Sequence, residues 1–342
     1  MAKNLIGIRR LAAELGISIG TVSRALNDRG EVNAETRRRV REAAERVGYV
    51  ANHSGRSLRQ GATRTIGVLW RVSDSLETHG EPFSVALFDG MQTELAAQGR
   101  DLVLLMTQPD EQLDRVRRVV ERGMVDALIL PWTQVEDPRL DYVATRSFPF
   151  VALGRSLSGG RHAWIDLDFE TAGRIAVQRL AAAGHRRLGL MVSSRDLMQG
   201  AILTQACQSA LEAVGLPPAS VMPEDLTEAG GYRSSRDLLG SDPRPTALIA
   251  NNERMAFGAY RLAAERGLQI GRDIAVIAIA SDTALCRYLS PSLTCFDAAP
   301  YALGRRLASA VLDELSGGAP SGTAELWPLT LQERESDVRH PA

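Results

Sequence analysis

Apolar residues at helical spacing open the chain. Ile8, Leu11, Ala12 and Leu15 recur three and four positions apart, which predicts a short helix with one apolar face. Gly16 follows directly, at a position where glycine commonly ends a helix. The first predicted element is therefore a helix over residues 8–15.

Two more short helices are predicted after this turn. Ser18 is a typical N-cap residue, and Val22, Ala25 and Leu26 behind it form an inward apolar stripe. Asn33 is an equally suitable N-cap for a third helix, whose helical repeat continues to a glycine at position 48. The first 50 residues thus predict a very small bundle of three helices.

The second predicted helix leaves an unusual set of side chains facing outward. They are Ile19, Gly20, Ser23, Arg24 and Asn27. Hydroxyls and backbone N–H groups bind phosphates, and an arginine can read the O6 and N7 atoms of guanine. The set is typical of a helix that enters the DNA major groove in a helix-turn-helix protein. The alternative is a helical hairpin with no partner.

From Thr65 onward, β-rich runs alternate with amphipathic segments. The runs are 65–70, 101–107, 127–132, 149–155, 187–191, 247–250, 274–280 and 293–297, and the segments include 85–99, 114–123, 172–185 and 254–267. This alternation predicts doubly wound parallel sheets. Eight runs favour two α/β lobes, and a ligand would bind beyond the carboxyl ends of the strands, in the cleft between the lobes.

Charge is distributed unevenly over the 342 residues, although the net charge is only −1. Residues 1–64 contain 13 basic and 6 acidic side chains, a net charge of +7, whereas residues 65–342 contain 27 basic and 35 acidic ones, a net charge of −8. This asymmetry favours a small module that binds a polyanion, joined to a larger part that does not. A solvated basic face is the alternative.

Composition bears on the cellular compartment. No apolar run approaches the roughly 18 residues of a membrane span, and the N-terminal MAKNLIGIRR lacks the apolar core of a signal peptide. Three cysteines, Cys207, Cys286 and Cys295, are too few for a disulfide framework and show no C-x-x-C spacing. We expect a cytoplasmic protein without membrane association, whose cysteines are buried as small hydrophobic residues.

The N-terminal motifs AAELGISIGTVSRALN, VNAETRRRVREAAERVGY and ANHSGRSLRQGATRTIGVL closely resemble the LacI family of bacterial transcription regulators. Further landmarks, such as IDLDFETAG, ANNERMAFGA and the closing RES, extend the resemblance over essentially the whole chain. It implies an N-terminal three-helix helix-turn-helix DNA-binding domain with a hinge helix, then an α/β two-lobed domain with parallel sheets that is similar to periplasmic sugar-binding proteins.

The resemblance also implies the domain boundaries. The DNA-binding headpiece would span 1–50, the hinge helix and linker 51–64, and the effector-binding and dimerisation domain 65–342. The N-lobe would comprise about 65–161 and 295–322, and the C-lobe about 162–294 and 323–338, with three crossings between the lobes.

Residue roles on DNA follow from the same resemblance. Ile19, Gly20 and Arg24 would face base edges, Ser18, Thr21, Ser23 and Asn27 would hold phosphates, and the linker contacts would be Asn52, Arg56, Leu58 and Arg59. Leu58 matches a leucine that wedges into the minor groove, flanked by the charges of Arg56 and Arg59. Ala51 and Gly55 depart from the usual proline and alanine. Glycine within a helix costs roughly 0.5–1 kcal/mol relative to alanine, so the hinge should depend unusually strongly on DNA to fold.

For the effector, the resemblance implies seven cleft residues: Phe83, Asp168, Leu203, Leu226, Asn252, Ser281 and Asp282. Leu203 replaces an arginine that often clamps sugar hydroxyls, Leu226 replaces an aromatic platform, and Ala298 replaces a polar residue. A cleft without its bidentate donor selects a polyol less strongly. Either Trp132, Arg155 or the loop with His79 and Glu81 replaces those contacts, or the effector is less polar.

Together these patterns favour a homodimeric transcriptional repressor that binds a palindromic operator and is controlled by a small effector, with a carbohydrate as the first expectation. The chain ends in DVRHPA without a leucine heptad, so we expect a dimer rather than a tetramer. No nucleotide, metal or nucleophile motif is present, and we expect no cofactor and no catalysis. The alternatives are an enzyme, a small-molecule-binding protein or a transport receptor of doubly wound fold with an incidental basic module.

Overall fold

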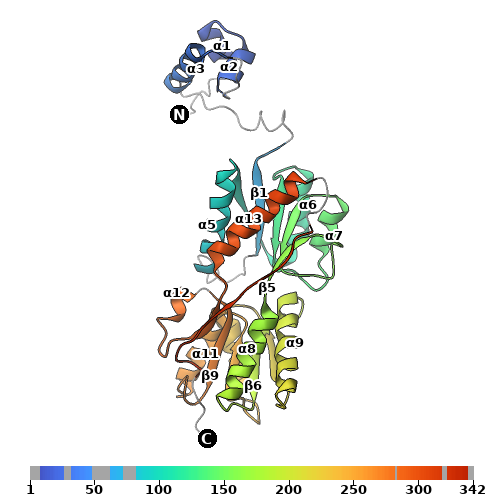
Figure 1. The fold of residues 1–342 in the computed structure, drawn as a ribbon, viewed down its shortest axis with the longest axis vertical. Helices are drawn as coiled ribbons and strands as arrows, with labels where there is room; N and C mark the ends of the chain where they lie inside the picture. Colours follow the sequence, from blue (N-terminus) through green and yellow to red (C-terminus); the bar gives the residue numbers. More distant parts are fainter. Residues whose placement is uncertain are drawn as a thin grey trace. The chain divides into compact units, whose positions relative to one another are not determined.

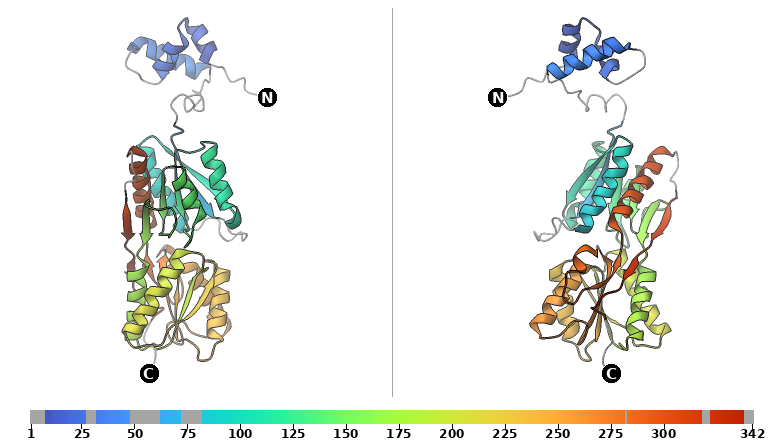
Figure 2. Two further views of the ribbon diagram at one scale, coloured as in Figure 1. Left: turned by 90° about the vertical axis from the view of Figure 1, so that its right-hand side faces the viewer. Right: turned by 60° about the vertical axis from the view of Figure 1, so that its left-hand side comes forward.

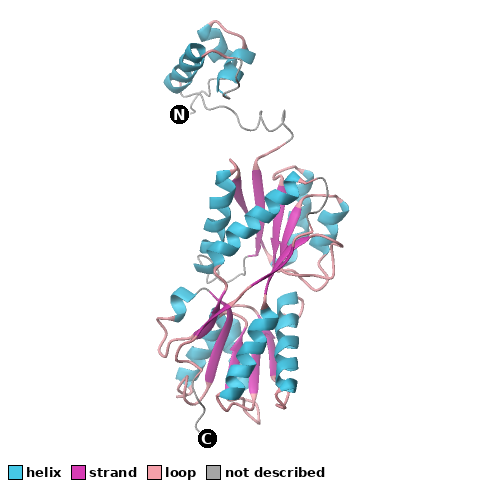
Figure 3. Ribbon diagram, in the orientation of Figure 1, coloured by secondary structure: helices cyan, strands magenta, loops and turns pink. Residues whose placement is uncertain are grey.

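The computed structural model describes residues 8–26, 32–47, 62–71, 82–281, 283–317 and 322–337. The chain divides into two compact units, residues 1–63 and 64–342. This division lies one residue from the boundary that the sequence predicts between the linker and the larger domain. Figure 1 labels many of the helices and strands, and Figure 3 colours them by type.

The N-terminal unit contains the three predicted helices, α1 (Ile8–Leu15), α2 (Ile19–Leu26) and α3 (Ala34–Arg46). Their common core includes Leu11, Val22, Ala25, Val40 and Ala43, which are all fully buried. The Asn33 side chain accepts a hydrogen bond from the Thr36 backbone N–H (2.7 Å), so it caps α3 as the sequence predicts. The three-helix bundle is confirmed.

The larger unit contains two six-stranded sheets. The first has the order β11 (Ala324–Trp327), β5 (Ala163–Leu167), β4 (Phe150–Leu153), β3 (Ala127–Pro131), β1 (Thr65–Arg71) and β2 (Asp101–Thr107). The second has the order β12 (Thr330–Gln332), β10 (Thr294–Asp297), β9 (Ala275–Ser281), β8 (Ala247–Ala250), β6 (Leu188–Ser193) and β7 (Ser220–Glu224). All paired neighbours are parallel except β10 and β12. The prediction of two parallel α/β lobes is confirmed.

Helices lie on both faces of each sheet (Figure 2). Those of the N-lobe are α5 (Pro82–Ala97), the 3-10 helix η2 (Pro109–Glu111), α6 (Gln112–Glu121), α7 (Pro138–Thr145) and α13 (Pro300–Ser316). Those of the C-lobe are α8 (Phe169–Ala182), α9 (Met198–Ala213), α10 (Glu228–Leu239), α11 (Glu253–Glu265) and α12 (Thr283–Cys286). None of the helices in the described ranges is both long and apolar enough to cross a membrane.

The three crossings between the lobes lie later in the chain than the sequence predicts. Strand β5 pairs with β4 and β11 and so belongs to the N-lobe, although residues from 162 were predicted in the C-lobe. Strand β10 pairs with β9 and belongs to the C-lobe, and β11 belongs to the N-lobe. The chain therefore crosses between β5 and α8, between β10 and α13, and between β11 and β12.

Paired glycines let helices touch at the backbone in each lobe. A Cβ atom on Gly90 of α5 would overlap the Tyr301 carbonyl oxygen of α13, and one on Gly304 would overlap the Leu87 carbonyl oxygen. In the C-lobe, Gly231 of α10 and Gly258 of α11 meet backbone atoms in the same way. These glycines are needed for close approach, because any side chain would force the two helices apart.

Candidate nucleic-acid interface and ligand cavity

The turn before α2 is built from local hydrogen bonds. Gly16 has a left-handed backbone (φ +65°), and the Ile17 N–H donates to the Ala12 carbonyl at 3.1 Å, which closes the end of α1. The Ser18 hydroxyl oxygen then accepts a hydrogen bond from the Thr21 N–H at 3.0 Å and lies 2.9 Å from the Thr21 hydroxyl. Ser18 is thus the N-cap of α2, as the sequence predicts, and its oxygen is already engaged.

The start of α2 presents the outward face that its sequence predicts. Ser18, Gly20 and Arg24 are exposed, and Ile19 is 41% exposed although it is a large hydrophobic residue. Thr21 and Ser23 are half-buried. The remaining predicted DNA contacts, Asn27, Asn52, Arg56, Leu58 and Arg59, lie outside the described residues.

Among the described residues of the N-terminal unit, the packing does not require a glycine at position 20. Of the atoms in residues 8–26 and 32–47, a Cβ atom there would meet only the Ser18 hydroxyl oxygen, at 3.6 Å, which is an ordinary contact. Glycine within a helix costs roughly 0.5–1 kcal/mol relative to alanine. The residue therefore lowers the stability of α2 without a packing benefit, which fits a surface that another molecule approaches closely.

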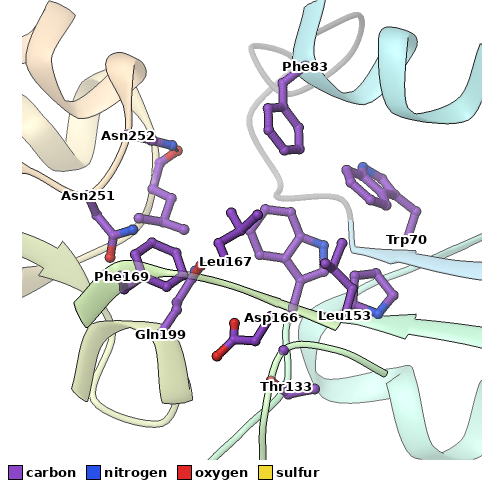
Figure 4. Close-up of a pocket in the computed structure, with 14 residues that line it drawn as sticks. Trp70, Phe83, Thr133, Leu153, Asp166, Leu167, Phe169, Gln199, Asn251 and Asn252 are labelled. Atoms are coloured by element: carbon purple, nitrogen blue, oxygen red, sulfur yellow. Dashed lines mark hydrogen bonds between the residues drawn. The ribbon is translucent and has the colours of Figure 1, made fainter. Parts of the chain in front are cut away.

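A cavity of about 690 Å³, which includes space open to solvent, lies between the two lobes. Its lining residues are Trp70, Phe83, Pro131, Trp132, Thr133, Leu153, Gly154, Asp166, Leu167, Phe169, Gln199, Leu226, Asn251 and Asn252. Figure 4 shows Asn251 and Asn252 on one side and Trp70 and Leu153 on the opposite side. Most of the N-lobe lining comes from the carboxyl ends of β1, β3, β4 and β5, where open parallel sheets bind ligands.

Aromatic rings form much of the N-lobe wall. The Trp70 ring meets Phe88 edge to face, with ring centroids 4.7 Å apart, and meets Trp132 in the same manner at 5.4 Å. These contacts fix the orientation of both indoles, because edge-to-face pairs are favoured by the ring quadrupoles. The wall is thus a preformed apolar surface rather than a loose group of side chains.

A buried ion pair supports this wall from behind. Arg139 is 2% exposed and Asp137 is fully buried, and the Arg139 Nε atom donates to Asp137 Oδ1 at 2.9 Å. Arg139 also donates to the carbonyl oxygens of Pro131 (3.1 Å) and Trp132 (3.0 Å) and to the Gln112 side chain. Burial by itself raises the pKa of Asp137, but hydrogen bonds and the charge of Arg139 bring it below its usual value.

Amides from the C-lobe face this wall. The Asn251 Oδ1 atom accepts from the Ser193 N–H at 3.1 Å, which ties the residue to β6. Asn252 caps α11, because its Oδ1 accepts from the Met255 N–H at 3.0 Å, while its Nδ2 donates to the Leu226 carbonyl at 3.2 Å. Both amides are therefore held in place from behind before any ligand binds.

Asp166 is the one acidic or basic residue among the described residues that line the cavity. Burial raises the pKa of Asp166, although the Arg155 Nε atom donates to its Oδ2 at 2.8 Å. Arg155 also pairs with Glu170 at 2.9 Å, so it bridges β5 and α8 at a crossing between the lobes. The charge of Asp166 is thus compensated outside the cavity.

The predicted effector residues are only partly brought together. Phe83, Leu226 and Asn252 line the cavity. Leu203 does not: it is fully buried in the core and packs against Gly173 of α8, because α9 turns this face toward α8. Asp168 does not line the cavity either, because its carboxylate caps α8 by accepting from the Thr171 N–H at 2.9 Å. Ser281 ends β9, but its side chain and Asp282 lie outside the described residues.

Other expectations for the cleft can be compared directly. Trp132 lines the cavity, whereas Arg155 acts on it only through Asp166. Ala298 is fully buried, and its carbonyl accepts from Trp327 Nε1 at 2.8 Å. His79 and Glu81 lie outside the described residues. The sequence analysis missed the other lining residues, which are Trp70, Pro131, Thr133, Leu153, Gly154, Asp166, Leu167, Phe169, Gln199 and Asn251. For several of them the available signal was their place at the end of a β-rich run.

A backbone clasp joins the lobes at one edge of the cavity. The Met198 N–H donates to the Thr133 carbonyl at 3.0 Å, and the Val135 N–H donates to the Asp196 carbonyl at 2.9 Å. Gln134 and Leu197 form an antiparallel bridge between these bonds. Thr133 and Gln199 line the cavity, so the hydrogen bonds that hold the two lobes together lie next to residues that a ligand would contact.

Met198→Pro should open this clasp while preserving α9. Met198 is the first residue of α9, where proline is tolerated, and the preceding Leu197 has an extended backbone (φ −85°, ψ 128°) that suits a following proline. The change removes the donor and places the ring against Thr133, so we expect a loss of about 1–3 kcal/mol in unfolding free energy. Urea denaturation measures it, with Met198→Leu as the control. Equal stability of the two variants would contradict a structural role for the clasp.

Known proteins are similar to this chain over almost its whole length. Residues 8–52 match the bacterial regulatory proteins of the lacI family, and residues 177–336 match the periplasmic binding protein-like domain. The HTH-type transcriptional regulator AglR of Rhizobium meliloti (strain 1021) is 31% identical over 338 residues, which cover 97% of this chain and 94% of that protein. The chain belongs to the LacI family.

Solved structures of LacI-family proteins have the same fold. A complex of the transcriptional regulator CelR with cellobiose is 26% identical, with a TM-score of 0.73 over 97% of this chain and 99% of that one. The lac repressor dimer bound to operator and the anti-inducer ONPF has a TM-score of 0.86 over 98% of this chain and all of that one, at 23% identity. The second likeness supports the shared fold alone.

Proposed function

We propose that the protein is a transcriptional repressor that binds a palindromic operator as a homodimer and changes its operator affinity when a small effector binds between the lobes. The observation that carries the proposal is the outward face of α2, where Ile19, Gly20 and Arg24 are exposed behind a capped turn. This is the arrangement by which a helix-turn-helix protein reads the major groove. AglR, RafR of Escherichia coli and CelR of Thermobifida fusca, all related over most of the chain, are HTH-type transcriptional regulators.

The effector cavity supplies the regulatory part of the proposal. A ligand changes an equilibrium between two lobe arrangements only if it binds one of them better. The cavity between the lobes offers such a site, since residues of both lobes line it. The cellobiose complex of CelR favours a saccharide as the effector. We further propose that the protein acts in the cytoplasm and by binding rather than catalysis.

We propose that the linker completes the DNA contact. Leu58 would insert into the minor groove, and Asn52, Arg56 and Arg59 would contact the adjoining backbone, with Asn27 on a phosphate near α2. A wedge of this kind costs a few kcal/mol of base unstacking, which the extra contacts of a bent duplex offset. Two-fold symmetry would place one wedge from each subunit at the centre of the operator.

Selection from random duplexes with the full chain tests the proposal. We expect recovery of one palindromic sequence, whose complex weakens or strengthens when a saccharide from a screened set is added. Recovery of no preferred duplex, with or without the saccharides, would contradict the proposed function. The same selected duplex then serves for the variants below.

Arg24→Ala should weaken binding to the selected operator by about 1–3 kcal/mol and relax the preference at one base pair in each half-site. Arg24 is exposed in the last turn of α2, where a guanidinium can reach a base edge. Gel-mobility titrations against operator and random duplex measure the two losses. Arg244→Ala, which removes an exposed arginine of the C-lobe, is the control. Equal losses on both duplexes would show that Arg24 binds phosphate instead.

Gly20→Ala should separate folding from DNA binding. The methyl group has space in the unit itself, so thermal stability should stay equal or rise by roughly 0.5–1 kcal/mol. Affinity for the operator should fall, because the added carbon occupies the surface that meets the duplex. Circular dichroism and the same titrations give both values. An operator affinity equal to that of the parent protein would contradict close approach at Gly20.

A further inference from the structure

Trp132 has a backbone conformation that is rare for its residue type. Its φ of +59° lies in the left-handed region, which a bulky residue seldom adopts. Its carbonyl is held by Arg139 Nη2 at 3.0 Å, and Arg139 is itself fixed by the buried Asp137. Strained positions that the surrounding structure maintains cluster at ligand-binding and catalytic sites. The cost of this conformation therefore needs a compensating role.

Two hydrogen-bond donors at the cavity are buried without a partner among the described residues. They are Nε1 of Trp132, from the N-lobe, and Nε2 of Gln199, from the C-lobe. Both residues line the same cavity. Buried polar atoms are paired in the great majority of cases, and an unpaired one is costly. An acceptor oxygen supplied by a bound molecule would satisfy each of them.

The charge of the cavity limits what that molecule can be. No lysine or arginine occurs among the described residues that line it, and the single carboxylate, Asp166, is compensated by Arg155. Among these described lining residues a phosphate or carboxylate group would be buried without a cation, which is strongly unfavourable. The remaining wall is mainly apolar and aromatic and suits the flat C–H face of a sugar ring.

From these features we propose that Trp132 and Gln199 orient the effector and that the cavity selects an uncharged saccharide over a phosphorylated or carboxylated one. Trp132 Nε1 and Gln199 Nε2 donate to oxygens of the same molecule, one from each lobe. A ligand held in this way bridges the two lobes beside the clasp. The inference rests on the proposed function, in which the cavity binds a small effector.

Isothermal titration of the full chain with defined saccharides tests the inference. The uncharged probes are cellobiose, lactose, maltose, melibiose and raffinose, and the charged probes are glucose 6-phosphate and gluconate. With the tightest uncharged probe, Trp132→Phe and Gln199→Met should each lose about tenfold in affinity, the value of one lost hydrogen bond. Each change keeps the bulk of the side chain and removes the donor.

Matched controls separate lost donors from altered folding. Trp327→Phe removes an indole donor that is bonded to the Ala298 carbonyl and does not line the cavity, and Gln205→Met alters an exposed amide of α9. Both control variants should bind the probe with an affinity within about twofold of that of the parent protein, which is the size of effect expected from a residue that does not contact the ligand.

The outcomes distinguish this inference from the proposed function. Unchanged saccharide affinity in both donor variants, tighter binding of a charged probe, or no binding of any uncharged probe at millimolar concentration would overturn the inference. In each of those cases the proposed function stands if the parent protein still selects a palindromic duplex. If it selects none, the proposed function fails whatever the saccharide titrations show.

Discussion

Arg139→Met is expected to lower the free energy of unfolding by about 3–5 kcal/mol, the range for breaking a buried ion pair from one side. The change leaves the Asp137 carboxylate fully buried without its cation and removes the donor to the Trp132 carbonyl. Water cannot replace the guanidinium without opening the site. Because that carbonyl belongs to the cavity wall, saccharide affinity should fall as well.

Urea denaturation followed by circular dichroism measures this loss. Arg261→Met removes an exposed pair with Glu265 and should change stability by less than about 1 kcal/mol. The double variant Asp137→Leu, Arg139→Met should be more stable than Arg139→Met alone, since it leaves no unpaired buried charge. A double variant that is less stable than the single one would show that packing, not charge, dominates.

The same pair has an expected pH dependence. The folded-state pKa of Asp137 lies below its ordinary value of 3.8, so its contribution is complete above that value. The contribution is lost as the pH falls through the lowered folded pKa. Arg139→Met should therefore differ most from the parent protein at neutral pH and least under strongly acidic conditions.

Gly90→Ala is expected to destabilise the N-lobe by about 1–3 kcal/mol or more, the cost of overpacking a close contact. The added methyl group would overlap the Tyr301 carbonyl oxygen of α13, which is backbone and cannot rotate away. Helix propensity alone would favour alanine by roughly 0.5–1 kcal/mol, so the sign of the result shows which effect dominates. Thermal unfolding measures it. Thr93→Ala, on an exposed position of the same helix, is the control, and a higher melting temperature for Gly90→Ala would contradict the close crossing.

Much of the fold could be predicted because its signals are local. The caps at Ser18 and Asn33 act on residues three positions away, and both form as expected. All eight β-rich runs form strands. Most of them are apolar stretches that a parallel sheet buries on both faces, whereas β2, at a sheet edge, leaves Leu104 and Met106 exposed. Such signals need no knowledge of distant parts of the chain.

Four strands escaped the sequence analysis for physical reasons. β7 contains Pro223 and lies at a sheet edge, where burial is incomplete, so its apolar pattern is weak. β11 and β12 have four and three residues, and both contain polar side chains, so neither forms an apolar run. β5 carries the charged Asp166, whose burial depends on Arg155 eleven residues earlier. Missing β5 and β11 displaced two of the three predicted lobe boundaries.

The cavity was harder to predict than the fold. Family position suggested Leu203 and Asp168, but the first faces α8 and the second caps it. Whether a helical residue lines a cleft depends on how α8 and α9 pack, which sequence spacing does not specify. The left-handed backbone of Trp132 could not be predicted from the sequence either, because Arg139, which belongs to another element, maintains it through a hydrogen bond.

The three crossings also determine the order in which a newly made chain can fold. The described part of the N-terminal unit is complete at residue 47, so it can form while most of the protein is still being translated. Neither sheet can do so, because β11 and β12 are supplied only by residues 324–327 and 330–332. During translation, the helices of the N-terminal unit can therefore fold long before the two lobes that bind the effector are complete.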